Sequence, residues 1–246
     1  MPYRRLPTTD KARLRALEAV QKFIIGKDPG SLAVSGGILS ELGIIKTNFE
    51  NHLKHHELNL KIESERNINY KQALEKARLY ISHFIQVLLM TVEREEIKPE
   101  VLLLYGLTSV KDKVPIMHTE KEILEWGRKV ISGEQQRMQK GGSPVYNPSI
   151  AVVKAKVEDF NEVAIFQSNL KRNNLRSFEK LQQLRKITNE FISRMWTEIE
   201  TSLDYLPPKQ KRQKAQEYGV VYVFRRNEKK KLKNEGLQVD LLFDFK

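Results

Sequence analysis

The sequence predicts a mainly α-helical protein, in which two tandem repeats of a three-helix unit plus a short helix form a helical bundle with a C-terminal β-hairpin. Three observations predict this fold: helical spacing of apolar residues along most of the chain, an offset that aligns its two halves, and β-branched and aromatic residues concentrated near its end. The predicted boundaries are 1–110 for the first repeat, 111–220 for the second repeat and 221–246 for the hairpin.

In the first repeat, apolar residues recur at three- and four-residue spacing in three stretches, and each stretch predicts a helix with one apolar face. The stretches run from Leu14 to Ile24, from Ile38 to Leu60 and from Leu74 to Val92. A short fourth helix is predicted after Pro99, and it should end at Gly106, because glycine can adopt the left-handed conformation that closes a helix.

The second repeat carries start and stop signals for helices at comparable places. Thr119-Glu-Lys-Glu122 is a capping-box sequence, and Asn147-Pro148 places a side-chain acceptor before a proline at the first helical position. Pro207-Pro208 precedes a second short helix, which should end at Gly219. Segments 26–37 and 133–147 are rich in Gly, Ser and Pro, and we expect both to be linkers.

One offset of 107 residues aligns the two halves of the chain at two distant places. It places Leu17, Glu18, Lys22, Ile24 and Gly26 on Leu124, Glu125, Lys129, Ile131 and Gly133, and Leu74, Arg78, Phe84, Ile85 and Glu93 on Leu181, Arg185, Phe191, Ile192 and Glu200. A six-residue insertion then aligns Tyr105-Gly106 with Tyr218-Gly219. The alternative is a chance alignment of amphipathic helices of similar composition, and the constant offset favours duplication of an ancestral unit.

The composition excludes several classes of function. The absence of cysteine excludes a disulfide scaffold, a thiol nucleophile and a thiolate metal site. No stretch approaches the ~20 apolar residues that span a bilayer, and the N-terminus lacks the apolar core of a secretory signal, so we expect a soluble cytoplasmic protein with no membrane partner. The sequence also lacks phosphate-binding, dinucleotide-binding and serine-hydrolase motifs. We therefore expect no catalytic residue and no cofactor, and a binding protein rather than an enzyme.

Positive charge is the most informative feature of the sequence, which has 43 basic and 31 acidic residues. Segment 205–235 alone has ten basic and three acidic residues, and we expect it to bind an acidic partner, either nucleic acid or an acidic protein surface. Lysine lacks the planar donors that read base edges, so binding to nucleic acid would be non-specific in sequence. The alternative is a solvated lysine-rich turn. The candidate anion-binding residues are Lys209, Lys211, Arg212, Lys214, Arg225, Arg226, Lys229, Lys230, Lys231 and Lys233.

A cluster of histidines supports an alternative function. His52 and His56 lie one turn apart on a predicted helix, as paired metal ligands on a helix must, and His83 on the next predicted helix offers a third ligand. This arrangement predicts a metal-binding bundle or a metalloenzyme. The competing interpretation is a solvent-facing or seam-forming polar cluster, because the aligned positions of the second repeat have no histidine.

The opening segment, Met1-Pro-Tyr-Arg-Arg-Leu-Pro-Thr-Thr-Asp10 followed by Lys11-Ala-Arg-Leu-Arg-Ala-Leu17, resembles the start of uncharacterised helical proteins of Bacteroidota. The resemblance implies a bacterial protein and no particular activity. A third function stays open beside binding of an acidic partner and binding of a metal. The hairpin packs either on the bundle or on a partner chain, and in the second case the protein is a homo-oligomer or a structural subunit of a larger assembly.

Overall fold

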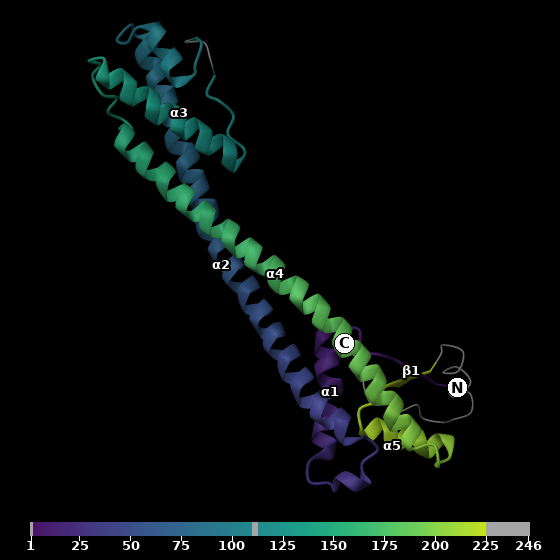
Figure 1. Ribbon diagram of the computed structural model, residues 1–246. Helices are drawn as coiled ribbons and strands as arrows, with labels where there is room; N and C mark the ends of the chain where they lie inside the picture. Colours follow the sequence, from purple (N-terminus) through teal and green to yellow (C-terminus); the bar gives the residue numbers. More distant parts are fainter. Residues whose placement is uncertain (1, 110–112, 225–246) are drawn as a thin grey trace. The chain divides into compact units, whose positions relative to one another are not determined.

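The computed structural model describes residues 2–109 and 113–224, and these are mainly helical (Figure 1). The elements in chain order are β1 (Tyr3–Arg4), α1 (Asp10–Ile24), the short helix η1 (Pro29–Ser31), α2 (Gly36–Glu93), the short helix η2 (Pro99–Tyr105), α3 (Glu120–Gln139), α4 (Ile150–Ser202), α5 (Pro208–Glu217) and β2 (Tyr222–Val223). The predicted helical class is confirmed. Among the described residues, no helix is long and apolar enough to cross a membrane.

Two of the helices are much longer than the sequence predicts. The helices expected to end at Leu60 and to begin at Leu74 are parts of one helix, α2, which has 58 residues, and α4 has 53 residues. The predicted break is wrong because segment 61–73 is polar but contains neither glycine nor proline. Nothing in that segment therefore stops the helix, although its apolar spacing fades.

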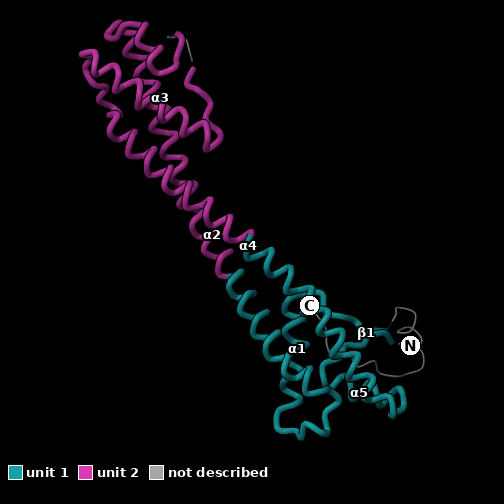
Figure 2. Tube along the Cα trace, in the orientation of Figure 1, with its two compact units in different colours: residues 1–57, 176–246 teal, residues 58–175 magenta. Residues whose placement is uncertain are grey.

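The chain divides into two compact units, which Figure 2 shows in different colours. Unit 1 comprises residues 1–57 and 176–246, and unit 2 comprises residues 58–175. Unit 1 thus contains α1, α5, the start of α2 and the end of α4, whereas unit 2 contains the rest of both long helices with η2 and α3. The predicted boundaries at 110 and 220 do not delimit these units, because each unit combines segments from both predicted repeats.

The core of unit 2 forms where the end of α2 packs on α3 and the start of α4. Phe84 of α2, Val130 of α3 and Phe160 of α4 are fully buried there, together with Tyr105 at the end of η2. Gly133 of α3 permits this packing, because a Cβ at that position would lie 2.6 Å from the Tyr105 ring. The predicted linker 133–147 is therefore too long: α3 continues to Gln139, and Gly133 is a packing residue of the helix.

The core of unit 1 forms where α1 packs on the end of α4 and the start of α2. Leu17 of α1, Leu42 of α2 and Trp196 of α4 are all buried in it. Tyr218, which follows α5, is buried in the same cluster, and its hydroxyl accepts a hydrogen bond of 2.9 Å from the backbone N–H of Ala33. The segment that joins α1 to α2 is thereby fixed to the C-terminal part of the unit.

Most of the predicted helix ends are confirmed. Gly106 after η2 and Gly219 after α5 have positive φ angles of 74° and 85°, as the predicted left-handed stops require. Thr119 caps α3 in a capping box with Glu122, as predicted. The start of α4 differs from the prediction, because the helix begins at Ile150 and Pro148 precedes it.

A short antiparallel sheet joins the two ends of the described chain within unit 1. Tyr3 of β1 lies opposite Val223 of β2, Arg4 lies opposite Tyr222, and the Arg5 N–H donates to the Val221 carbonyl at 2.9 Å. The strand predicted to open the C-terminal hairpin therefore pairs with the N-terminal segment. The rest of the predicted hairpin, residues 225–246, lies outside the described residues.

Candidate anion-binding site

Unit 1 has most of the positive charge of the protein. Its sequence, residues 1–57 and 176–246, has 25 basic and 16 acidic residues, a formal net charge of +9. Unit 2, residues 58–175, has 18 basic and 15 acidic residues, a formal net charge of +3. The net positive charge is therefore concentrated in unit 1.

Helix α5 presents part of this charge on the surface of unit 1. Lys209 and Lys214 are exposed, and within the described residues neither of them has an acidic partner. Lys211 forms an ion pair with Asp204, and Arg212 is half-buried. Two of the four predicted anion-binding residues on α5 thus remain available to a partner. The other six predicted residues lie outside the described residues: Arg225, Arg226, Lys229, Lys230, Lys231 and Lys233.

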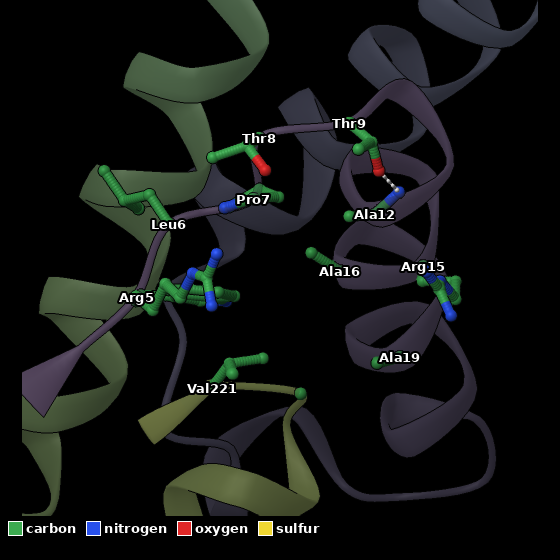
Figure 3. Close-up of a pocket in the computed structure, with 12 residues that line it drawn as sticks. Arg5, Leu6, Pro7, Thr8, Thr9, Ala12, Arg15, Ala16, Ala19 and Val221 are labelled. Atoms are coloured by element: carbon green, nitrogen blue, oxygen red, sulfur yellow. Dashed lines mark hydrogen bonds between the residues drawn. The ribbon is translucent and has the colours of Figure 1, made fainter. Parts of the chain in front are cut away.

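A pocket of about 220 Å³ lies in the same unit, where the N-terminal segment passes over α1 (Figure 3). One wall is the face of α1 with Ala12, Ala16 and Ala19, and the opposite wall is segment 5–9. Trp196 of α4, Gly219 and Val221 complete the lining. The hollow exists because the three alanines, spaced four and three residues apart, give that face of α1 side chains too small to fill it.

The polar side chains that line this pocket are those of Arg5, Arg15, Thr8 and Thr9. Arg5 and Arg15 are exposed, and among the described residues no acidic residue lines the pocket. Thr9 uses its hydroxyl to accept from the Ala12 N–H at 3.2 Å, which caps α1. Trp196 is fully buried, and within the described part of the chain its indole Nε1 has no hydrogen-bond partner. The exposed Arg5 of the lining favours a ligand that accepts hydrogen bonds.

The strand that leads to Arg5 is tied to α4. Arg4 donates hydrogen bonds to the Glu200 carboxylate at 3.1 Å and to the Thr197 hydroxyl at 3.0 Å. The Tyr222 hydroxyl of the paired strand donates to the same carboxylate. Burial and the Glu200 carboxylate both raise the pKa of Tyr222, so this hydroxyl stays protonated and keeps donating. These bonds hold the N-terminal wall of the pocket in place.

The N-terminus of α1 carries its own ion-pair network. The Asp10 carboxylate accepts from Arg185 Nη2 at 2.6 Å and from Arg13 Nη1 at 2.9 Å. Burial alone would raise the pKa of Asp10, but the hydrogen bonds and charges of Arg185 and Arg13 outweigh it and hold this pKa below its ordinary value. The negative charge of Asp10 is thus already compensated within the protein.

We expect Asp10→Asn to lower the free energy of unfolding at pH 7 by about 1–3 kcal/mol, because Asp10 accepts charge-assisted hydrogen bonds from two arginines. The folded-state pKa lies below the unfolded value, so the contribution is complete above the unfolded pKa and is lost as pH falls through the folded pKa. Urea unfolding at pH 7 and at pH 3 should show this loss. Asp159→Asn, at an exposed position of α4, is the control, and an equal effect of both variants would contradict the prediction.

The predicted metal ligands do not form a metal site. His52 and His56 lie in unit 1, whereas His83 is an exposed residue of unit 2. His56 Nδ1 lies 2.7 Å from the Ser177 hydroxyl, and its ring contacts Phe178 with centroids 5.9 Å apart. In the part of the chain that the structure describes, no three His, Cys, Asp or Glu side chains are grouped closely enough to hold a metal ion. The geometry thus fits the polar-seam interpretation of His56.

Unit 2 contains a buried polar cluster that the sequence analysis missed. The Glu134 carboxylate accepts from Arg137 Nη2 at 2.7 Å, from the Val145 N–H at 3.1 Å and from the Tyr105 hydroxyl. Arg137 also donates to the Ser143 carbonyl at 2.6 Å. Because every one of these groups is paired inside the protein, the cluster fixes η2 and the segment after α3. The ion pair could have been predicted, because Glu134 and Arg137 are three residues apart on one helix. The part of Tyr105 could not, because this residue is distant from both in the sequence.

Comparison with known proteins adds no relative: no protein-family model, no curated protein and no solved structure matches the chain. The function must therefore be argued from the site itself.

Proposed function

We propose that this protein is a non-catalytic binding protein that uses the basic C-terminal part of unit 1 to bind an acidic partner. The observation that carries the proposal is the charge asymmetry between the units, +9 against +3. The exposed Lys209 and Lys214, without acidic partners in the described residues, support it. Charges placed in this way attract phosphate or carboxylate groups at long range and release counterions when the partner binds.

Binding to a fluorescently labelled single-stranded DNA and to a labelled polyglutamate peptide, measured by anisotropy at several salt concentrations, tests this proposal. We expect the logarithm of the binding constant to fall linearly with the logarithm of salt concentration for at least one probe. The double variant Lys209→Glu/Lys214→Glu should weaken binding and lower the magnitude of the slope by about two.

The matched control is Lys180→Glu/Lys186→Glu, which reverses two exposed lysines on α4 of the same unit. This control changes the net charge by the same amount but leaves α5 intact. Equal losses in the two double variants would show that net charge alone matters, and the absence of salt-dependent binding to either probe would refute the proposal.

We also infer that the chain arose by duplication, with α1, α2 and η2 corresponding to α3, α4 and α5. The hydrogen bonds at the two Tyr-Gly stops support this inference, because Leu107 N–H donates to Leu102 O at 3.0 Å and Val220 N–H donates to Ala215 O at 3.1 Å. A Cβ added to Gly219 would contact Ala19 of α1, and a Cβ added to Gly106 would contact Lys129 of α3. Ala19 and Lys129 thus take equivalent places, which aligns α1 with α3 at an offset of 110 residues. The offset predicted from the sequence is 107, and the difference of three residues is close to one helical turn.

A further inference from the structure

The dimensions of the pocket in unit 1 limit what it can hold. A cavity of about 150 Å³ is large enough to bind benzene, and the pocket has about 220 Å³. A side-chain-sized or small organic ligand fits this volume, whereas a nucleic-acid strand does not enter it.

The walls of the pocket select an apolar body for the ligand. Ala12, Ala16 and Val221 offer only apolar side-chain atoms, and the fully buried Trp196 lies behind them. A polar body would lose its hydration against these walls without gaining hydrogen bonds. An alkyl or aromatic group is the part of a ligand that such walls bind.

The polar groups select the charge of the ligand. Arginine donates hydrogen bonds and accepts none, and among the described residues the lining contains Arg5 and Arg15 but no carboxylate. The N-terminus of α1 lies at the same pocket, where the helix dipole favours negative charge. A carboxylate satisfies both of these preferences.

We propose that this pocket binds a small amphipathic carboxylate, with an unbranched or aromatic apolar body of roughly six to ten carbon atoms. The apolar body lies against the alanine face of α1, and the carboxylate accepts hydrogen bonds from Arg5. None of the lining residues named for this pocket belongs to α5, so the proposal goes beyond the proposed function and does not rest on it.

The test uses the full chain with Trp126→Phe, because the protein has two tryptophans and this change leaves Trp196 as the sole emitter. Octanoate is the probe. We expect a saturable change in Trp196 emission and a matching heat of binding by isothermal titration calorimetry. Octanamide, which has the same body without the charge, should bind at least tenfold more weakly, and acetate, which has the charge without the body, should not bind.

Two variants locate the binding. Arg5→Ala should weaken octanoate binding at least tenfold, and Ala12→Leu, which fills the pocket, should abolish it. Arg176→Ala, at an exposed position of α4 in the same unit, is the control and should have no effect. Because Arg5→Ala changes an exposed residue and octanamide requires no variant, the test does not depend on correct folding of Ala12→Leu.

Three results would overturn the proposal: no saturable binding of octanoate, equal affinity for octanoate and octanamide, or equal losses in Arg5→Ala and Arg176→Ala. Octanoate binding that leaves the Trp196 emission unchanged would place the ligand elsewhere and would also refute it. The variant Lys209→Glu/Lys214→Glu should bind octanoate as the wild type does. The outcome of this test is therefore independent of whether α5 binds an acidic partner.

Discussion

Glu134→Ala is expected to lower the free energy of unfolding of unit 2 by about 3–5 kcal/mol, the range for loss of one partner from a buried ion pair. The Glu134 side chain is fully buried and Arg137 is 5% exposed. Removal of the carboxylate leaves the guanidinium of Arg137 without its ion-pair partner, and it also leaves the Tyr105 hydroxyl and the Val145 N–H without their acceptor. Urea denaturation followed by tryptophan fluorescence, to which Trp126 of α3 contributes, measures the effect.

The control for this variant is Glu125→Ala, which removes an exposed carboxylate from the same helix and should change stability little. The double variant Glu134→Ala/Arg137→Met separates a buried charge from a loss of packing. It should be more stable than Glu134→Ala alone, because no unpaired guanidinium remains. If Glu134→Ala is no less stable than Glu125→Ala, the cluster does not hold the unit together.

The pH dependence of this effect has a defined direction. Burial would raise the pKa of Glu134, but hydrogen bonds from Arg137, Tyr105 and the Val145 N–H outweigh burial and hold this pKa below its ordinary value. The stabilisation by the carboxylate is therefore complete above the unfolded-state pKa of about 4.3 and is lost as pH falls through the folded-state pKa. The difference between wild type and Glu134→Gln should accordingly shrink in acid.

The sequence predicted the helical class well, because each helix buries one face and so shows apolar residues at helical spacing. The same pattern wrongly predicted a break between Leu60 and Leu74, where α2 is continuous. Apolar residues at helical spacing mark the turns of a helix that are buried, and a helix can continue through turns that are exposed. Local signals located the capping box of Thr119 and the stops at Gly106 and Gly219 correctly, because these motifs depend on neighbouring residues only.

The compact units and the pocket could not be predicted by local signals. Apolar faces at helical spacing do not specify which helices pack together, so the association of α1 with the end of α4 was not visible. The pocket needs segment 5–9, α1, Trp196 and Val221 at one place, and these are separated by up to about two hundred residues of sequence. The charge of α5 was predictable because it is a property of composition, whereas the Lys211–Asp204 pair that neutralises part of it is a tertiary contact.

Glycines within helices give a further prediction, because the same substitution should have opposite effects at two positions. Gly43 lies on α2, and a Cβ added there has nothing within 4 Å. Gly43→Ala should therefore stabilise the protein by about 0.5–1 kcal/mol through helix propensity. At Gly133 of α3, an added Cβ would lie 2.6 Å from the Tyr105 ring and 2.8 Å from the Leu104 carbonyl oxygen.

The contact at Gly133 cannot relax cheaply, because the Leu104 oxygen is backbone and the Tyr105 hydroxyl is hydrogen-bonded to Glu134 and Arg137. Overpacking of a fixed core costs about 1–3 kcal/mol and occasionally more, so Gly133→Ala should be clearly destabilising although it gains about 1 kcal/mol of helix propensity. Thermal or urea unfolding of both variants, followed by circular dichroism, measures the difference in sign. A Gly133→Ala protein as stable as Gly43→Ala would mean that η2 does not pack on α3 at this distance.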